Sequence, residues 1–371
     1  MKFIHIADVN LGAQPDRGRI WSDVRAKEIY STFHRVIEVC EEQKIELLLI
    51  AGNLFYTKPT EQDLKELDFQ LRKIPNTKTV IIAGDQDYID PGSAWETYTF
   101  ESNTIVMPRD QAASVYFEDL NVCVSGYSYG HATYTGRILE RMRPGKPDAY
   151  NILLGHGGDM EHMPFSKEHV AKLGFQYVAL GHMHKPAHIL KNHMAFAGTL
   201  EPLSYTETGK HGYILGEVST SGETTITFVP FACRKYVNMA MDINSTYTNG
   251  DICNLVEGKM QELGADNIYR ILLRGRAAQN MEINLSELTR RYCINEVIDK
   301  TECDYDMDEL HVSNHDNLLG RLIDELTDDK KGGDKAIRDK ALHYCMEALL
   351  GAGEKLSLIH ISEPTRPRLI S

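Results

Sequence analysis

Several features that would each point to a particular class of protein are missing from this sequence. It contains no run of about 18 apolar residues, so no segment is predicted to span a membrane. The seven cysteines are scattered without a Cys-x-x-Cys pair, which argues against disulfides and a zinc knuckle and predicts a reducing, cytoplasmic location. Asp8 interrupts the N-terminal apolar stretch too early for a signal peptide.

Positive charge is not in excess either. The formal net charge of -13 weighs against a surface that attracts nucleic acid uniformly, although a local groove can still be positive. Basic residues gather in three places as candidate contacts to DNA phosphates, but solvated charged faces are the commoner explanation. These places hold Arg17 and Arg19, then Arg137, Arg141, Arg143 and Lys146, and then Arg270, Arg274 and Arg276.

The chain is long enough for two domains, with 371 residues of which 42% are hydrophobic. Residues 1–232 alternate apolar strands with amphipathic helices, which predicts a layered α/β domain with additional antiparallel strands. The first helix is expected to begin with Ser22 as its N-cap. Strands are expected at 2–7, 45–52 and 78–84, and helices at 22–43 and 60–74.

The pattern changes near residue 233. Residues 233–304 fit a β-α-β-α-β unit, predicted to be a second domain, and residues 305–355 predict a helical tail. Residues 356–371, "LSLIHISEPTRPRLIS", share no periodicity with that tail, and their first eleven residues resemble the translation of a transposase adapter used in sequencing libraries. They are interpreted as read-through after a native chain cut near Lys355, with a genuine disordered tail as the alternative.

Polar side chains follow the ends of the main strands of the first domain. They are Asp8 and Asn10, Asn53, Asp85, Gln86 and Asp87, His156, and finally His182 and His184. Ligands of open α/β sheets bind outside the carboxyl ends of the strands, and His182 and His184 are spaced to point to the same side. The sequence therefore predicts that these side chains form one site. His162 and His188, also near these strands, are interpreted as ordinary polar positions.

The donor set predicts metal chemistry. Imidazole, carboxylate and amide oxygen together suit manganese, iron or zinc rather than calcium. Asp8, Asn10, Asn53, Asp85, His156, His182 and His184 are the predicted ligands. These are too many for one tetrahedral ion and suit two divalent ions about 3.5–4 Å apart.

The order of these motifs resembles that of the calcineurin-like metallophosphoesterases. The motifs read "D-x-N", "G-N-x-x", "G-D-Q-D", "G-H-G" and "G-H-M-H". "FIHIADVNLG", "GHMHKP" and "AFAGTLEPLSYTETGKHGY" resemble the nuclease subunit of SbcC–SbcD-type DNA repair complexes and related exonucleases. The resemblance implies a four-layer α/β fold, a central pair of β-sheets flanked by helices, and a small α/β capping domain at residues 233–304. It also implies DNA exonuclease activity with two ions, manganese being expected, and DNA, an SbcC-like ATPase and a second copy of the chain as candidate partners.

The resemblance implies roles for individual residues. Asp8, Asn10 and His184 would hold one ion, and Asp85, His156 and His182 the other. Asn53 would bridge the two ions. Gln86 stands where the family has a histidine beside the phosphate, and Gln86 and Asp87 are the candidate catalytic residues.

Four positions depart from the family pattern. Asn10 replaces a histidine, Asn53 the bridging aspartate, Asp85 an asparagine and Gln86 a histidine. A neutral amide bridges two cations poorly, and Gln86 has no proton to give, which costs about 10²–10⁴ in rate where a general acid is needed. Asp85 can supply the charge that Asn53 lacks. Two alternatives therefore stay open beside an active DNA phosphodiesterase: an impaired homologue that serves as a scaffold subunit, and a phosphoesterase acting on a small substrate.

Overall fold

The structure is a computed structural model that describes residues 1–279, 281–327 and 334–350. Contacts divide the described chain into two compact units. The larger unit contains Met1–Met241, Cys253–Leu273 and Asn284–Asp299, and the smaller contains Asp242–Ile252, Arg274–Ile283 and the described residues from Lys300 onward. The domain boundary predicted after residue 232 stays a prediction, and the proposed read-through segment 356–371 lies outside the described residues.

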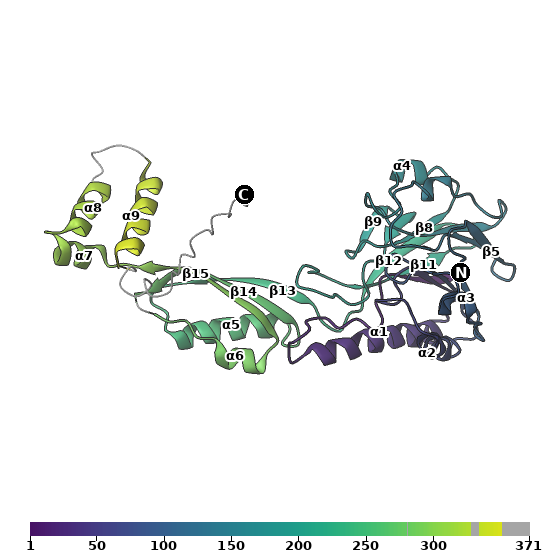
Figure 1. Ribbon diagram of the computed structural model, residues 1–371, viewed down its shortest axis with the longest axis horizontal. Helices are drawn as coiled ribbons and strands as arrows, with labels where there is room; N and C mark the ends of the chain where they lie inside the picture. Colours follow the sequence, from purple (N-terminus) through teal and green to yellow (C-terminus); the bar gives the residue numbers. More distant parts are fainter. Residues whose placement is uncertain (280, 328–333, 351–371) are drawn as a thin grey trace, which may run out of the picture. The chain divides into compact units, whose positions relative to one another are not determined.

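Two six-stranded mixed sheets form the centre of the larger unit (Figure 1). The first has the order β12-β11-β1-β2-β3-β4, and the second the order β5-β6-β7-β8-β10-β9. Strands β1, β2, β3 and β4 are parallel, as are β6, β7, β8 and β10. The bounds are β1 Lys2–Ile6, β2 Leu47–Ala51, β3 Lys78–Ile82, β4 Thr104–Val106, β5 Ala113–Phe117, β6 Val122–Gly126, β7 Tyr150–His156, β8 Tyr177–Gly181, β9 Ala187–Leu190, β10 Met194–Phe196, β11 Gly212–Val218 and β12 Thr224–Pro230.

The alternation of side chains along each strand makes the layers. Phe3 on β1 and Ala7 just after it join the apolar core between the two sheets, whereas Ile4 and Ile6 face the core under helices α1 (Ser22–Glu42) and α2 (Glu61–Leu71). The outer face of the second sheet is covered by a third core with α4 (Lys167–Val170) and the 3₁₀ helix η1 (Leu139–Arg141). The predicted α/β fold with two central sheets flanked by helices is thus confirmed.

The two main helices begin differently. The prediction that Ser22 caps α1 is wrong, because the helix begins at Ser22 itself and the Ser22 hydroxyl donates to the Pro15 carbonyl at 2.8 Å. Thr60 does cap α2, by a reciprocal pair of hydrogen bonds with Asp63. The short helix α3 (Ala94–Thr97) follows β3.

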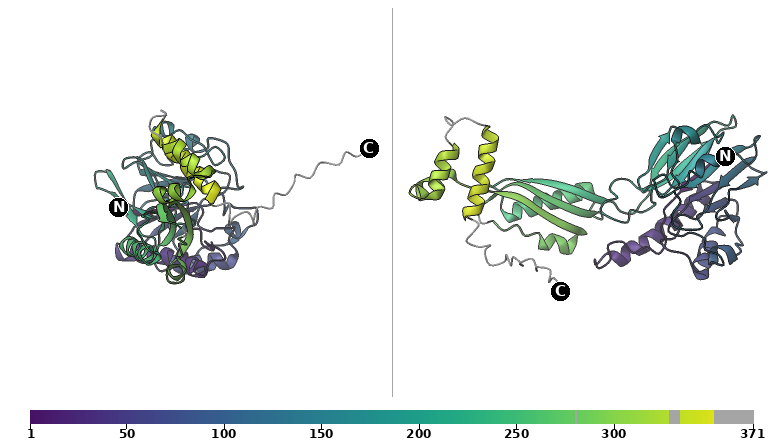
Figure 2. Two further views of the ribbon diagram at one scale, coloured as in Figure 1. Left: turned by 90° about the vertical axis from the view of Figure 1, so that its left-hand side faces the viewer. Right: turned by 45° about the horizontal axis from the view of Figure 1, so that its top comes forward.

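A third sheet has the order β13-β14-β15, with β13 at Tyr236–Ile243, β14 at Ile268–Ala278 and β15 at Ile294–Asp304. Helices α5 (Asn249–Leu263) and α6 (Ser286–Arg291) alternate with its strands, as the β-α-β-α-β pattern predicts. Helices α7 (Met307–Asn314), α8 (Leu318–Thr327) and α9 (Lys335–Leu350) follow. Figure 2 shows α8 and α9 side by side, joined by an apolar cluster that includes Leu319 and Met346.

The arginines of the third sheet each have an acidic partner. Ion pairs join Arg270 to Glu296 at 2.6 Å, Arg274 to Asp242 at 2.6 Å and Arg276 to Asp304 at 3.4 Å. All three pairs are partly or largely exposed, so they contribute little to stability. They do reduce the positive charge that this sheet could offer to a phosphate backbone.

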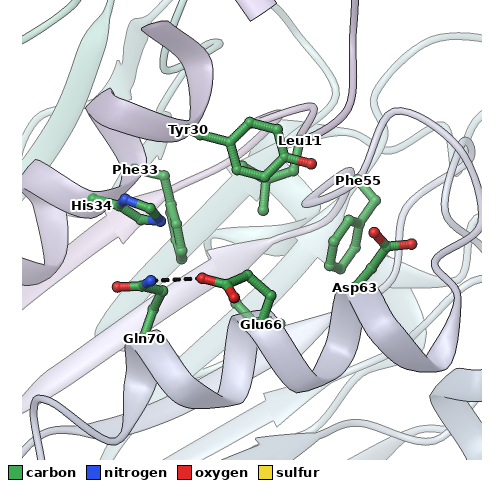
Figure 3. Close-up of a pocket in the computed structure, with 9 residues that line it drawn as sticks. Leu11, Tyr30, Phe33, His34, Phe55, Asp63, Glu66 and Gln70 are labelled. Carbon is green, nitrogen blue, oxygen red and sulfur yellow. Dashed lines mark hydrogen bonds between the residues drawn. The ribbon is translucent and has the colours of Figure 1, made fainter. Parts of the chain in front are cut away.

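A small cavity lies between α1 and α2, where Figure 3 shows Tyr30 and Phe33 from one helix and Glu66 and Gln70 from the other. Its volume of about 40 Å³ is far below the several hundred Å³ of a typical substrate pocket, so it is a packing defect or a water site. Among the described residues, no helix combines the length and apolar character needed to cross a membrane.

His5 is a polar exception in the core between the sheets. The side chain is fully buried, and its Nδ1 lies 2.9 Å from the Tyr177 hydroxyl on β8. Burial lowers the pKa of His5 from 6.5 to about 3, because the charged imidazolium would lose its hydration.

We expect this buried imidazole to make stability depend on pH. In the unfolded chain His5 is protonated below pH 6.5, whereas in the folded protein it stays neutral down to about pH 3. The free energy of unfolding therefore falls as the pH falls from 6.5 to about 3. The contribution to the slope is about 1.4 kcal/mol per pH unit. His5→Gln should lose this contribution in urea denaturation at a series of pH values, whereas exposed His188→Gln should retain it. Equal slopes for all three proteins would contradict the prediction.

Candidate metal centre

The carboxyl ends of the parallel strands from both sheets meet at one place. Backbone hydrogen bonds join the loop after β1 to the loop after β2, from the Asp8 N–H to the Gly52 carbonyl and from the Asn10 N–H to the Asn53 carbonyl, both at 3.0 Å. The His156 ring at the end of β7 reaches across to β2, with its Nδ1 2.7 Å from the Ala51 carbonyl. The two sheets therefore present their strand ends to a common site.

Glycine makes the close approach between the sheets possible. A Cβ atom at Gly52 would lie 2.3 Å from Nδ1 of His156, and φ at Gly52 is +86°, a conformation that other residues rarely adopt. A Cβ at Gly181 would lie 1.9 Å from the Ala51 carbonyl oxygen. The glycines beside the predicted ligands thus leave room for the histidine and the facing backbone.

The backbone at the site is strained. Asp8, Asn10 and Asn53 have φ of 48°, 57° and 51°, a region that Asp and Asn tolerate better than other residues. His182 has φ of 89°, which is rarer, and its N–H donates to the Asp8 carboxylate at 2.8 Å. Strained residues of this kind cluster at functional sites.

Asn53 lies between two carboxylates. Its Nδ2 donates to Asp8 Oδ1 at 3.1 Å and to Asp85 Oδ1 at 3.0 Å. Its Oδ1 accepts the backbone N–H of Gln86 at 3.0 Å, so only this orientation of the amide satisfies every partner. All three side chains, Asn53, Asp8 and Asp85, are buried. The amide N–H groups reduce the electrostatic repulsion between the two adjacent carboxylates.

Asp85 is the centre of the histidine cluster. Its Oδ1 lies 2.8 Å from Nε2 of His156 and 3.3 Å from Nδ1 of His182. Burial opposes ionisation of Asp85, but the hydrogen bonds to His156 and His182 outweigh it and hold the pKa of this carboxyl well below its usual range. Burial likewise disfavours the His182 imidazolium, but hydrogen bonds to Asp85 and Asp159 raise the pKa of His182 to about 9.

Gln86 and Asp87 have different environments. Gln86 is exposed at the edge of the cluster, where its Nε2 donates to Asp85 Oδ2 at 2.8 Å. Asp87 is fully buried, and its carboxylate accepts backbone N–H groups from Asn53, Gly84 and Phe55 at 3.2, 2.7 and 3.2 Å. Burial raises the pKa of Asp87 to about 6. Asp87 is therefore placed to hold the loops after β2 and β3 together.

The two halves of the predicted ligand set are arranged differently. Donor atoms of Asp85, His156 and His182 all lie within 4.8 Å of one another, which fits one ion bound at about 2.0–2.2 Å from each. In the other half, the Asn10 amide donates to the Asp8 carbonyl at 2.8 Å. His184 instead bonds through Nδ1 to Glu207 Oε1 at 2.9 Å, and this contact raises the pKa of His184. The residues present thus fit one metal ion, and the arrangement with two ions stays a prediction.

Sequence reasoning missed two acidic residues of this region, and it undervalued one histidine. Asp159 Oδ2 lies 2.7 Å from Nε2 of His182, and Glu207 orients His184. His162, interpreted as an ordinary polar position, bonds through Nδ1 to Asp159 at 2.8 Å. Asp159 and His162 could have been identified from the sequence, because they follow His156 in the same loop.

Comparison with known proteins places these residues in a family context. A sequence model described as calcineurin-like phosphoesterase matches residues 1–186. The chain is 24% identical over 303 residues to the "Uncharacterized metallophosphoesterase YhaO" of Bacillus subtilis (strain 168), covering 75% of this chain and 73% of that protein.

Archaeal proteins named "DNA double-strand break repair protein Mre11" are also similar. The protein from Methanocaldococcus jannaschii is 26% identical over 263 residues, which cover 64% of this chain and 69% of the relative. The protein from Methanopyrus kandleri is 25% identical over 261 residues, which cover 62% of this chain and 56% of the relative.

The contact between Asn53 and the two carboxylates predicts the effect of restoring a carboxylate there. Asn53→Asp places a third buried anion beside Asp8 and Asp85, so without metal the free energy of unfolding should fall by about 3 kcal/mol or more. Because a divalent cation neutralises that charge, adding manganese should raise the melting temperature of Asn53→Asp more than that of the unaltered protein. Thermal and urea denaturation with and without metal measure both effects.

Asn192→Asp is a matched control for that substitution. Asn192 uses Oδ1 to accept the Ile226 N–H at 3.2 Å, an acceptor role that aspartate preserves. If Asn53→Asp and Asn192→Asp have the same stability without metal, Asn53 does not separate two charged groups.

Proposed function

Because this chain belongs to the calcineurin-like phosphoesterase family, we propose that it is a metal-dependent phosphodiesterase that hydrolyses DNA, in the manner of a repair exonuclease. The observation that carries the proposal is the convergence of Asp85, His156 and His182 at the strand ends of both sheets. Proteins of this family use divalent metal ions. These three residues would hold at least one, with manganese as the expected ion and iron or zinc as alternatives.

A bound divalent ion supplies a water of lowered pKa and polarises the phosphoryl oxygens. The chain's own residues position the reacting groups. Gln86 lies at the exposed edge of the cluster, where its amide can donate a hydrogen bond to a phosphate oxygen. It carries no titratable proton, so the leaving oxygen takes its proton from solvent. This arrangement predicts a slow enzyme.

DNA is proposed as the substrate because the archaeal relatives are named as DNA double-strand break repair proteins. The proposed capping domain at residues 233–304 fits a polymer substrate better than a small one. An SbcC-like ATPase and a second copy of this chain are proposed as partners. The pairing of Arg270 with Glu296 and of Arg274 with Asp242 lowers the net positive charge that this sheet could offer to DNA.

One observation favours a second candidate, an impaired homologue that acts as a binding subunit. Asn53 presents its Nδ2 rather than its oxygen to Asp8 and Asp85, and an amide N–H cannot bind a cation. The Asn53 side chain would have to turn over before it could bridge two ions. That rotation breaks the hydrogen bond with the Gln86 backbone.

An activity assay separates these candidates. With manganese and labelled linear duplex or single-stranded DNA, the protein should release nucleotides, and Asp85→Ala or a chelator should abolish the release. Gln86→His should raise the rate by about 10²-fold or more, since it restores a general acid. Cleavage of an aryl phosphodiester but not of DNA would indicate a small substrate. Absence of turnover with manganese, iron and zinc would reject the enzymatic proposal in favour of the binding subunit.

A further inference from the structure

The loop after β7 folds back toward the histidine cluster. The Gly158 N–H donates to the His162 carbonyl at 2.7 Å, which closes the loop on itself. Gly157 allows this closure, because a Cβ there would lie 2.4 Å from the His162 carbonyl oxygen and its φ is +139°. The Asp159 carboxylate accepts the N–H groups of Glu161 and His162 at 2.9 and 2.8 Å, which fixes its direction.

Asp159 and His162 form a second triad with His182. Donor atoms of the three side chains all lie within 4.8 Å of one another, and the rings of His162 and His182 are 4.4 Å apart between centroids. The side chains of Asp159, His162 and His182 are 42%, 18% and 14% exposed, so an ion can reach this triad from solvent. Two imidazoles and one carboxylate, with room for water, are a ligand set that zinc and similar ions bind.

His182 belongs to both triads through different nitrogen atoms. Its Nδ1 faces Asp85 at 3.3 Å and its Nε2 faces Asp159 at 2.7 Å. A neutral imidazole has one unprotonated nitrogen, so it binds a metal through one side while the other nitrogen donates a hydrogen bond. An ion on one triad therefore leaves the other triad without its third ligand.

We infer that Asp159, His162 and His182 form an accessory divalent-cation site, which competes with the Asp85 and His156 site for the imidazole of His182. The chemical class of ligand is a borderline transition-metal dication such as zinc. The inference rests on the proposed function only in taking Asp85, His156 and His182 as the site of the catalytic ion. Movement of one ion between the two triads would make the metal content of the catalytic site depend on the loop after β7.

Metal binding by paired variants tests this inference without any activity measurement. The full chain is stripped with a chelator and titrated with cobalt or zinc alone, by visible absorption and by calorimetry. Asp85→Ala removes the carboxylate ligand of the catalytic triad, and this variant should still bind one ion. Adding His162→Gln to Asp85→Ala should weaken that binding by more than about 100-fold, because even residues behind metal ligands change affinity by about 10–100-fold.

The controls distinguish the accessory site from the proposed catalytic one. Exposed His188 on β9 provides the matched substitution, so Asp85→Ala combined with His188→Gln should bind like Asp85→Ala alone. If His162→Gln leaves binding to Asp85→Ala unchanged, or if Asp85→Ala binds no ion while folded by circular dichroism, the accessory site is rejected. The single variant His162→Gln should keep one ion at the catalytic triad. Loss of all binding in that variant would instead count against the proposed function and leave the accessory site standing.

Discussion

The amide of Asn53 separates the buried carboxylates of Asp8 and Asp85, and the rest of the site is arranged around this contact. Two anions taken out of water next to each other need either a cation or a hydrogen-bond donor between them. The amide provides the donor, and the histidines on the far side of Asp85 provide further hydrogen bonds. The site is therefore stable as a hydrogen-bonded network in its own right.

This network bears on how the chain can use a metal ion. A cation bound to Asp85, His156 and His182 takes the place of hydrogen bonds that these residues otherwise make with one another. Binding is thus an exchange of partners within a preformed cluster, so the scaffold need not assemble when the ion arrives. Asp87 supports this preorganisation, because its buried carboxylate fixes the loops that carry Asn53 and Asp85.

The same geometry distinguishes two kinds of departure from the family pattern. Asp85 supplies a negative charge where we propose that the family has a neutral asparagine, and the triad with His156 and His182 suits a cation. On the proposed correspondence with the family, Asn53 lacks the charge of a bridging aspartate and Gln86 lacks the titratable proton of a histidine. We therefore expect these departures to lower the catalytic rate more than they lower the affinity for a cation.

The sequence by itself determined the layered fold and the positions of most site residues. Continuous apolar runs such as β2 specify strands that are buried on both faces, and parallel strands must bring their carboxyl ends, with Asp8, Asn53 and Asp85, to one edge. Only the tertiary structure decided which nitrogen of His182 faces which carboxylate and which way the Asn53 amide points. It also brought Asp159 and His162 back to His182. These features depend on side-chain torsions and on the closure of a glycine-containing loop, and no periodic pattern of residues encodes either.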